Sequence, residues 1–138
     1  MAGYWRAMSE QSVDRFVKAT EAFNRGDVEA WLEQYDPEVV FEPQVAAVEG
    51  ASVGHDGMRA FAATIGDLYD RFQVRFHEVR DLGDRVLALG EASSIGRGSG
   101  IRMDQPLAIV ASFREGRIVH FKDYGEEAEA LEAVGLSE

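Results

Sequence analysis

The spacing of apolar residues changes from helical to alternating about halfway along the chain. Up to Phe72, apolar side chains recur mainly every three or four residues, as they do on the buried face of an amphipathic helix. From Gln73 to Tyr124, apolar and polar residues alternate, as they do in strands that bury one face. This order predicts a group of helices followed by a group of antiparallel strands.

The first two predicted helices have recognisable ends. The longer one begins at Ser9 or Ser12, since either serine side chain can cap it, and the glycine of Asn24-Arg-Gly26 stops it. A short second helix begins after the capping side chain of Asp27. It ends at Asp36-Pro37, because proline cannot continue a helix.

A third helix, capped by Asp56, has the clearest apolar face, formed by Met58, Phe61, Ala62, Ile65, Leu68, Tyr69 and Phe72. A short strand at Glu38–Glu42 precedes it, and residues 44–55 between them resemble a loop. Four longer strands are predicted at Gln73–Leu82, Arg85–Ile95, 101–113 and Arg117–Tyr124. A last helical segment spans Glu126–Val134, whose first turn is acidic, as the helix dipole favours.

Helices followed by strands indicate the α+β class. The expected fold is a cone-shaped, curved, mixed or antiparallel sheet packed against three helices, with an apolar pocket at the open end of its core. A chain of 138 residues is the size of one domain. We assign residues 9–138 to that domain and residues 1–8 to a loose N-terminal tail.

Composition and charge narrow the possible partners and location. The net charge of −11 argues against nucleic acid and against anionic membrane surfaces, because both attract clustered Lys and Arg. The absence of cysteine excludes disulfides and thiolate chemistry. No basic region followed by an apolar run opens the chain, and no apolar stretch is long enough to cross a membrane, so a cytoplasmic protein is expected.

Four motifs, in this order, resemble the superfamily of ketosteroid isomerase, nuclear transport factor 2 and the SnoaL-like polyketide cyclases. They are Asn24-Arg-Gly-Asp27, Asp36-Pro-Glu-Val-Val-Phe-Glu-Pro43, Gly54-His-Asp-Gly-Met-Arg-Ala-Phe61, and Phe113-Arg-Glu-Gly-Arg-Ile118 leading into Phe121-Lys-Asp-Tyr124. The resemblance covers residues 9–135. It implies a cystatin-like α+β barrel, a homodimer packed through the sheet, and a pocket for a small apolar molecule.

Two carboxylates are the candidate catalytic groups. Glu42 stands before Pro43, where the resemblance places the general base of ketosteroid isomerases. Asp123 shares a strand face with Val119 and Phe121, and the resemblance places the catalytic acid of limonene epoxide hydrolases at this position. Two carboxylates in one pocket push their pKa values apart, which supplies one acid and one base.

The usual partners of these acids are missing. The two oxyanion donors of ketosteroid isomerases fall on Ala19 and Ala111, so steroid isomerisation itself is not expected. The Arg-x-Asp partner of the epoxide hydrolases falls on Ala92-Ser-Ser94. Each acid therefore also has a structural interpretation: Glu42 as a solvated edge-strand acid, and Asp123 as an acid that holds a backbone amide or an arginine such as Arg59.

Large side chains at helical spacing either line a ligand cavity or fill the core. The candidates for substrate binding are Phe16, Trp31, Tyr35, His55, Phe61, Ile65, Tyr69 and Phe121. His120 is expected on the strand face of Ile118, opposite Asp123, and His77 on an exposed sheet face. Histidines scattered in this way have no metal-binding spacing, so neither a metal nor another cofactor is predicted.

Two functions are consistent with these residues. The first is a cofactor-independent isomerase, cyclase or hydrolase that applies the acid–base chemistry of Glu42 and Asp123 to an apolar carbonyl or epoxide compound. It requires both carboxylates to face one cavity. The second is a non-catalytic ligand-binding or dimeric scaffold protein on the same fold, which the missing partners favour.

Overall fold

The computed structural model describes residues 2–45 and 48–136. Its elements are, in chain order, α1 (Ala2–Asn24), α2 (Val28–Leu32), β1 (Tyr35–Glu42), β2 (Gln44–Val45), β3 (Val48–Glu49), β4 (Ser52–Val53), α3 (His55–Leu68), β5 (Tyr69–Asp81), β6 (Arg85–Gly96), β7 (Arg102–Arg114), β8 (Arg117–Asp123) and α4 (Glu127–Ala133). The four long strands of the second half agree with the predicted ones to within a few residues.

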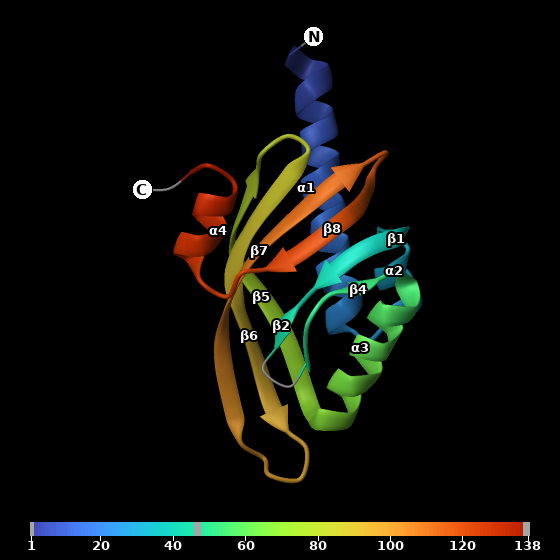
Figure 1. Cartoon of the computed structure of the whole chain (residues 1–138), viewed down its shortest axis with the longest axis vertical. Coiled ribbons are helices and arrows are strands. Elements are labelled where there is room, and N and C mark those ends of the chain that lie inside the picture. The colour runs from blue at the N-terminus through green and yellow to red at the C-terminus, as the bar shows by residue number, and fades with distance from the viewer. Residues whose placement is uncertain (1, 46–47, 137–138) are drawn as a thin grey trace.

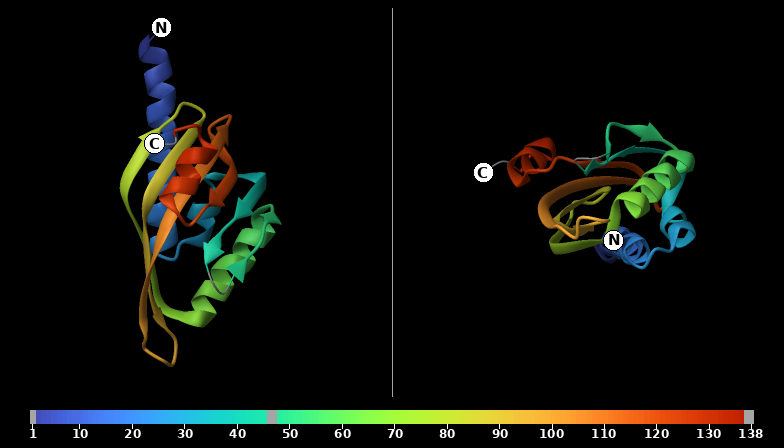
Figure 2. Two further views of the ribbon diagram at one scale, coloured as in Figure 1. Left: turned by 60° about the vertical axis from the view of Figure 1, so that its left-hand side comes forward. Right: turned by 90° about the horizontal axis from the view of Figure 1, so that it is seen from below.

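The sheet has the strand order β4-β1-β8-β7-β6-β5 (Figure 1). The strands pair antiparallel except for β1 and β8, which run parallel, so the sheet is mixed. Helices α1, α2 and α3 lie on one side of the curved sheet and α4 on the other, as the view from below shows (Figure 2). The predicted α+β class and curved sheet are confirmed, and α4 adds a layer on the second face.

Helix α1 is longer than predicted. It begins at Ala2, whereas the sequence indicated a start at Ser9 or Ser12 and a loose tail over residues 1–8, so that prediction was wrong for residues 2–8. Figure 1 shows the first turns of α1 projecting beyond the sheet. Apolar periodicity with a capping serine indicates where an amphipathic helix packs, and it does not fix how far the helix continues toward the N-terminus.

Several other element ends differ from the prediction. Helix α2 ends at Leu32, before the predicted stop at Asp36-Pro37, and α3 ends at Leu68, so Tyr69 and Phe72 belong to β5 and not to the helix. Helix α3 begins after Gly54, and Asp56 lies in its first turn instead of capping it, with its carboxylate 3.5 Å from Arg59. Strand β1 begins at Tyr35, before Pro37, because its pairing with β8 is irregular between Tyr35 and Val40 and so tolerates a proline. The segment predicted as a loop contains the short strands β2, β3 and β4.

A bulge in β8 decides which of its side chains face the core. Ser112 of β7 pairs with His120, but its neighbour Phe113 pairs with Ile118, so Val119 is an extra residue in β8. Ile118 therefore enters the core and is fully buried, although strict alternation placed it on the outer face with His120.

The second face of the sheet has its own small core. Helix α4 covers apolar residues of β6 and β7 that point away from the main core: Leu87, Leu89, Ala108 and Val110, packed against Ala130 and Leu131. The sequence predicted the C-terminal helical segment but not the face of the sheet on which it lies. A C-terminal helix with two buried residues is enough to close the centre of it.

The end of α1 is tied to the edge of the sheet. The Asn24 side chain accepts a hydrogen bond from the Val74 N–H and donates one to the Val74 carbonyl, both at 2.8 Å. The Gln73 side chain in turn donates to the Asn24 carbonyl at 3.0 Å. These bonds satisfy backbone groups of the edge strand β5 that lack a neighbouring strand.

None of the helices in the described part of the chain combines the length and the apolar character that crossing a membrane requires. The cytoplasmic location stays a prediction.

Candidate functional site

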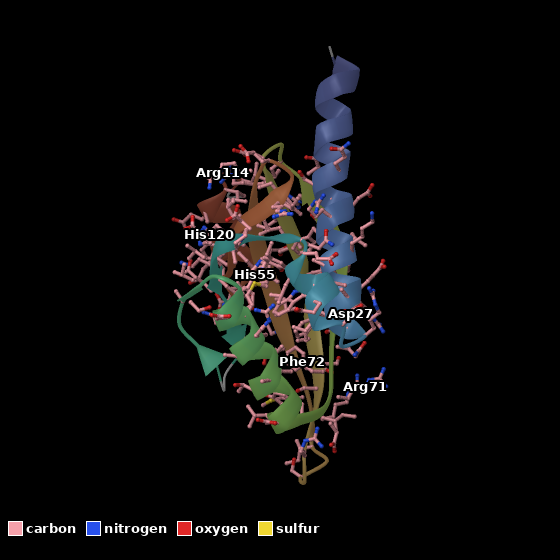
Figure 3. The ribbon with its side chains drawn as sticks, turned by 90° about the vertical axis from the view of Figure 1, so that its right-hand side faces the viewer. Asp27, His55, Arg71, Phe72, Arg114 and His120 are labelled. Atoms are coloured by element: carbon pink, nitrogen blue, oxygen red, sulfur yellow. The ribbon has the colours of Figure 1, made fainter. Side chains whose placement is uncertain are left out.

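The main core encloses a cavity of about 70 Å³ between helices α1 to α3 and the inner face of the sheet. Its walls are rich in aromatic side chains and come from the three helices and the inner face of the sheet: Phe16, Thr20, Phe23, Trp31, Tyr35, Phe41, Pro43, Gln44, Phe61, Phe72, Val74, Phe76, Leu107, Ile109, Phe121 and Asp123. In Figure 3, Phe72 lies between α3 and the long strands, on this inner side.

Five of the predicted substrate-binding residues line this cavity: Phe16, Trp31, Tyr35, Phe61 and Phe121. The other three contact it indirectly or not at all. The His55 ring is hydrogen-bonded to the Tyr35 carbonyl at 2.9 Å, which ties the start of α3 to β1. Ile65 belongs to the packed core, and the Tyr69 ring lies against Phe72 at 5.4 Å.

The prediction missed the contribution of the strands to the cavity wall. Phe72, Val74 and Phe76 alternate along β5 and all face inward, and Leu107 and Ile109 do the same on β7. That alternation is visible in the sequence. It identifies an inward face, but it does not show which inward residues border the unfilled part of the core.

Asp123 is the only acidic residue of the cavity wall among the described residues, and it is 5 % exposed. Its Oδ1 accepts hydrogen bonds from the backbone N–H groups of Ala108 at 3.1 Å and Gly125 at 2.9 Å. The predicted contact to a backbone amide is therefore observed. The alternative partner, Arg59, instead pairs with Glu29 at 3.1 Å on the surface.

The second oxygen of Asp123 is available to a ligand. Oδ2 has no hydrogen-bond partner within residues 2–45 and 48–136, and that part of the chain holds no side-chain polar atom that is both fully enclosed and unpartnered. Burial raises the pKa of the Asp123 carboxyl above its ordinary value, and the two backbone N–H groups oppose that rise. A carboxyl that holds its proton more readily than an exposed aspartate thus borders an apolar cavity.

Glu42 is not part of the cavity wall. It lies on the outer side of the sheet, where its Oε2 is 2.5 Å from the Nε2 of His120 (Figure 3 labels this histidine). Both side chains are partly exposed. Glu42 and Asp123 meet only at the edge of a separate hollow of about 240 Å³, which they border with Lys122. The structure therefore does not bring the two candidate acids together inside the aromatic cavity.

Tyr35 adds a second polar group to the cavity wall. It is 2 % exposed, and burial raises the pKa of its hydroxyl, while a hydrogen bond with Trp31 only partly opposes that rise. The phenol therefore stays neutral and keeps its proton. Ala19 and Ala111, which occupy the positions of the missing oxyanion donors, are buried in the core.

Gln44 and Asp123 mark the mouth of the cavity. Both also border a larger hollow on the surface beside α4, so they separate the aromatic interior from the outside. The Gln44 carbonyl accepts a hydrogen bond from the Gln105 side chain at 3.5 Å. Among the residues that the structure describes, no group of three or more histidine, aspartate or glutamate side chains is arranged to hold a metal ion.

Known proteins share this sequence pattern and fold. Residues 4–121 match the sequence profile of the SnoaL-like domain family. An uncharacterized PhzA/B-like protein of Pseudomonas aeruginosa is 27 % identical over 123 residues, which are 86 % of this chain and 86 % of that protein. An NTF2-like protein of unknown function from Burkholderia pseudomallei superposes with a TM-score of 0.77 at 23 % identity, over 88 % of this chain and 95 % of its own. TerC, co-crystallized with polyporic acid, superposes with a TM-score of 0.76 at 19 % identity, over 91 % of this chain and 98 % of its own.

Proposed function

Since the chain belongs to the SnoaL-like domain family, we propose that it binds a small apolar molecule in the aromatic cavity and moves a proton on that molecule with Asp123. One observation carries the proposal. The Asp123 carboxyl is buried in the wall of the cavity, with one oxygen fixed by two backbone N–H groups and the other without a partner among the described residues. A fixed carboxyl with a raised pKa is suited to general acid–base catalysis.

The chemistry that fits this group is proton transfer next to a carbonyl. The ionised Oδ2 of Asp123 takes a proton from a carbon beside the carbonyl, the C–H electron pair forms a carbon–carbon double bond, and the carbonyl oxygen takes the negative charge. Return of the proton to another carbon completes an isomerisation, and attack of the new nucleophilic carbon on a second carbonyl closes a ring. In its protonated form, the same group donates a proton to an epoxide oxygen.

The size of the cavity limits the part of the ligand that it encloses. An apolar cavity of about 150 Å³ holds benzene, whereas this one measures about 70 Å³. A larger molecule therefore extends past Gln44 and Asp123 at the mouth, or displaces side chains of the wall. TerC, a protein of this fold, was co-crystallized with polyporic acid, which supports the proposal that the ligand here is also a small organic molecule.

A non-catalytic ligand-binding protein is the second candidate function. It is favoured by the position of Glu42, which lies outside the cavity beside His120 and leaves Asp123 without the second carboxylate that the sequence suggested. In this case Asp123 stabilises the fold through the hydrogen bonds that its Oδ1 accepts, and the cavity binds a ligand without changing it.

Proton exchange at the ligand distinguishes the two functions. Cyclopentanone in D₂O exchanges the hydrogens beside its carbonyl, which NMR follows directly. We expect the wild type to accelerate this exchange. The rate that the protein adds should fall at least about a hundredfold in Asp123→Asn, which is the usual contribution of a general base. Asn keeps the oxygen that accepts the two N–H bonds, so the fold is preserved.

Glu42→Gln is the matched control, because it removes a carboxylate outside the cavity, and it should leave the exchange rate unchanged. If the wild type and both variants leave the exchange at its rate without protein, the non-catalytic function is favoured instead. Loss of exchange in Glu42→Gln but not in Asp123→Asn would contradict the assignment of the base.

We also propose a homodimer packed through the part of the outer sheet face that α4 leaves uncovered. Helix α4 covers the centre of the outer face. The uncovered part includes Val40, which is 36 % exposed, and the neighbouring His120 of β8. Sedimentation of the wild type and of Val40→Asp tests this: a dimer that the substitution dissociates supports the proposal, and a monomeric wild type rejects it.

A further inference from the structure

We propose that the Tyr35 hydroxyl donates a hydrogen bond to an oxygen atom of the ligand, so that the cavity selects apolar molecules that carry a carbonyl or another acceptor oxygen. The inference rests on the proposed function, because it concerns the ligand of the same cavity. It supplies the donor that is missing at Ala19 and Ala111, from a different element of the fold.

The first argument concerns the hydroxyl proton. None of the side-chain hydrogen bonds among the described residues takes the Tyr35 hydroxyl proton, and the group that acts on the phenol oxygen as a hydrogen-bond donor is the Trp31 side chain. An indole N–H can only donate, so the phenol oxygen accepts this bond and its own proton is left to be given elsewhere. Removing a polar hydrogen from water without an acceptor is costly, and the ring is almost fully buried. An acceptor in the cavity removes that cost.

The second argument concerns the surroundings of the ring. Tyr35 packs against Trp31, Phe41 and Phe121, with ring centroids 5.7, 6.4 and 6.3 Å away. These side chains hold no acceptor oxygen. His55 binds the Tyr35 backbone carbonyl and not its hydroxyl, which fixes the residue at the start of β1. The side that remains for the proton is the cavity, which Tyr35 lines.

The third argument concerns the other polar groups of the wall. The Thr20 hydroxyl donates to the Phe16 carbonyl of its own helix at 3.1 Å, so its proton is already used. Gln44 lies at the mouth, and Asp123 accepts through Oδ1. Among the described residues that line the interior, Tyr35 thus has a neutral O–H group whose proton no protein group accepts.

The positions of Tyr35 and Asp123 also orient the ligand. The Phe121 ring contacts Tyr35, and Asp123 follows two residues later on the same face of β8, about 7 Å further along the strand. The hydroxyl and the carboxylate therefore contact different ends of a bound molecule. An acceptor oxygen at the inner end and an exchangeable hydrogen toward the mouth match a conjugated carbonyl compound, in which the two are separated by several bonds.

The test compares two ligands of equal shape, cyclopentanone and methylenecyclopentane, of which only the ketone has an acceptor oxygen. Their dissociation constants are measured on the full chain by NMR titration. Tyr35→Phe should weaken ketone binding relative to the hydrocarbon about three- to tenfold, the net contribution of one hydrogen bond. Tyr69→Phe is the matched control, because that residue lies outside the cavity wall, and it should leave the ratio unchanged. An unchanged ratio in Tyr35→Phe overturns the proposal.

A second measurement needs no variant and decides the matter if Tyr35→Phe does not fold. The infrared carbonyl stretch of ¹³C-labelled cyclopentanone bound to the wild type should lie below its frequency in an alkane, since a donated hydrogen bond weakens the C=O bond. A frequency equal to that in the alkane overturns the proposal. Because both tests report binding, they can succeed when Asp123→Asn shows no loss of proton exchange, so failure of the catalytic function and failure of this inference are distinguishable.

Discussion

Replacing Asp123 with alanine should destabilise the protein far more than replacing it with asparagine. The alanine variant leaves two backbone N–H groups without their acceptor, those of Ala108 and Gly125, which now lie 3.1 and 2.9 Å from Oδ1. Ala108 is fully buried, so water cannot take the place of the lost oxygen there. Gly125 is partly exposed, and its N–H can be hydrated. Asparagine retains an oxygen at the same position, so both bonds survive.

The expected difference follows from these two bonds. An unsatisfied buried donor costs about 1–3 kcal/mol, and a hydrogen bond that water can replace contributes about 0.5–1.5 kcal/mol. Together they make Asp123→Ala less stable than Asp123→Asn by about 1.5–4.5 kcal/mol. Both variants remove the buried charge, so its desolvation cancels in the comparison. The difference is a large fraction of the 5–15 kcal/mol that stabilises a typical domain.

Urea unfolding of both variants at pH 7, followed by circular dichroism, measures this difference. Equal slopes of the free energy against urea show that the unfolded states are comparable. If the two variants unfold within about 0.5 kcal/mol of each other, Oδ1 does not hold the end of β8 in place, and the reasoning from its two hydrogen bonds is refuted. Such a result would also remove the structural interpretation of Asp123.

Three further predictions concern stability. Burial raises the pKa of Asp123 in the folded state, so the wild type should lose stability relative to Asp123→Asn as the pH rises from about 3.9, the ordinary aspartate value, through the raised folded pKa. Thermal unfolding of both proteins between pH 4 and 8 measures the difference in stability. A wild type that gains stability relative to the variant over this range contradicts the prediction. Gly125→Ala should lower the free energy of unfolding by about 1–2 kcal/mol, because Gly125 has φ +80° and an added Cβ meets the Gln44 side chain. In a Gln44→Ala background the loss should be smaller but not zero. An equal loss in both backgrounds would show that the Gln44 contact does not contribute. Asn24→Ala should cost about 1–3 kcal/mol and speed amide exchange at Val74, with unaltered exchange there as the contrary outcome.

Much of the fold was predictable because the local pattern and the tertiary structure agree. The predicted switch from helical to alternating spacing after Phe72 comes four residues later than the real change from α3 to β5, which falls between Leu68 and Tyr69. The family resemblance is confirmed by the profile match over residues 4–121. The start of α1 at Ala2 was not predictable from periodicity, because the helical spacing of apolar residues becomes recognisable only from Val13 onward. The bulge at Val119 depends on how β8 pairs with β7, which no local pattern in β8 shows.

The candidate site was predictable only in part, for similar reasons. Alternation put Asp123 on the face of Phe121, and both line the cavity. The same rule applied to β1 turns Phe41 inward and therefore Glu42 outward, yet the neighbouring proline and the resemblance suggested a pocket base. Tyr35 was expected as an apolar wall residue, because the sequence does not show that its hydroxyl is enclosed with the donor Trp31 as its neighbour.

The bond pair between Asn24 and Val74 has a consequence for how molecules of this protein meet one another. An open edge strand is a template onto which another chain can add, and β5 is a long edge strand. Asn24 occupies its backbone groups at Val74, while the exposed Arg71 and Arg75 place charges on either side. The opposite edge, β4, has only two residues. Because both edges of the sheet are protected against strand addition, contacts between copies are expected at its faces. Loss of the Asn24 side chain would expose β5 to edge-to-edge aggregation.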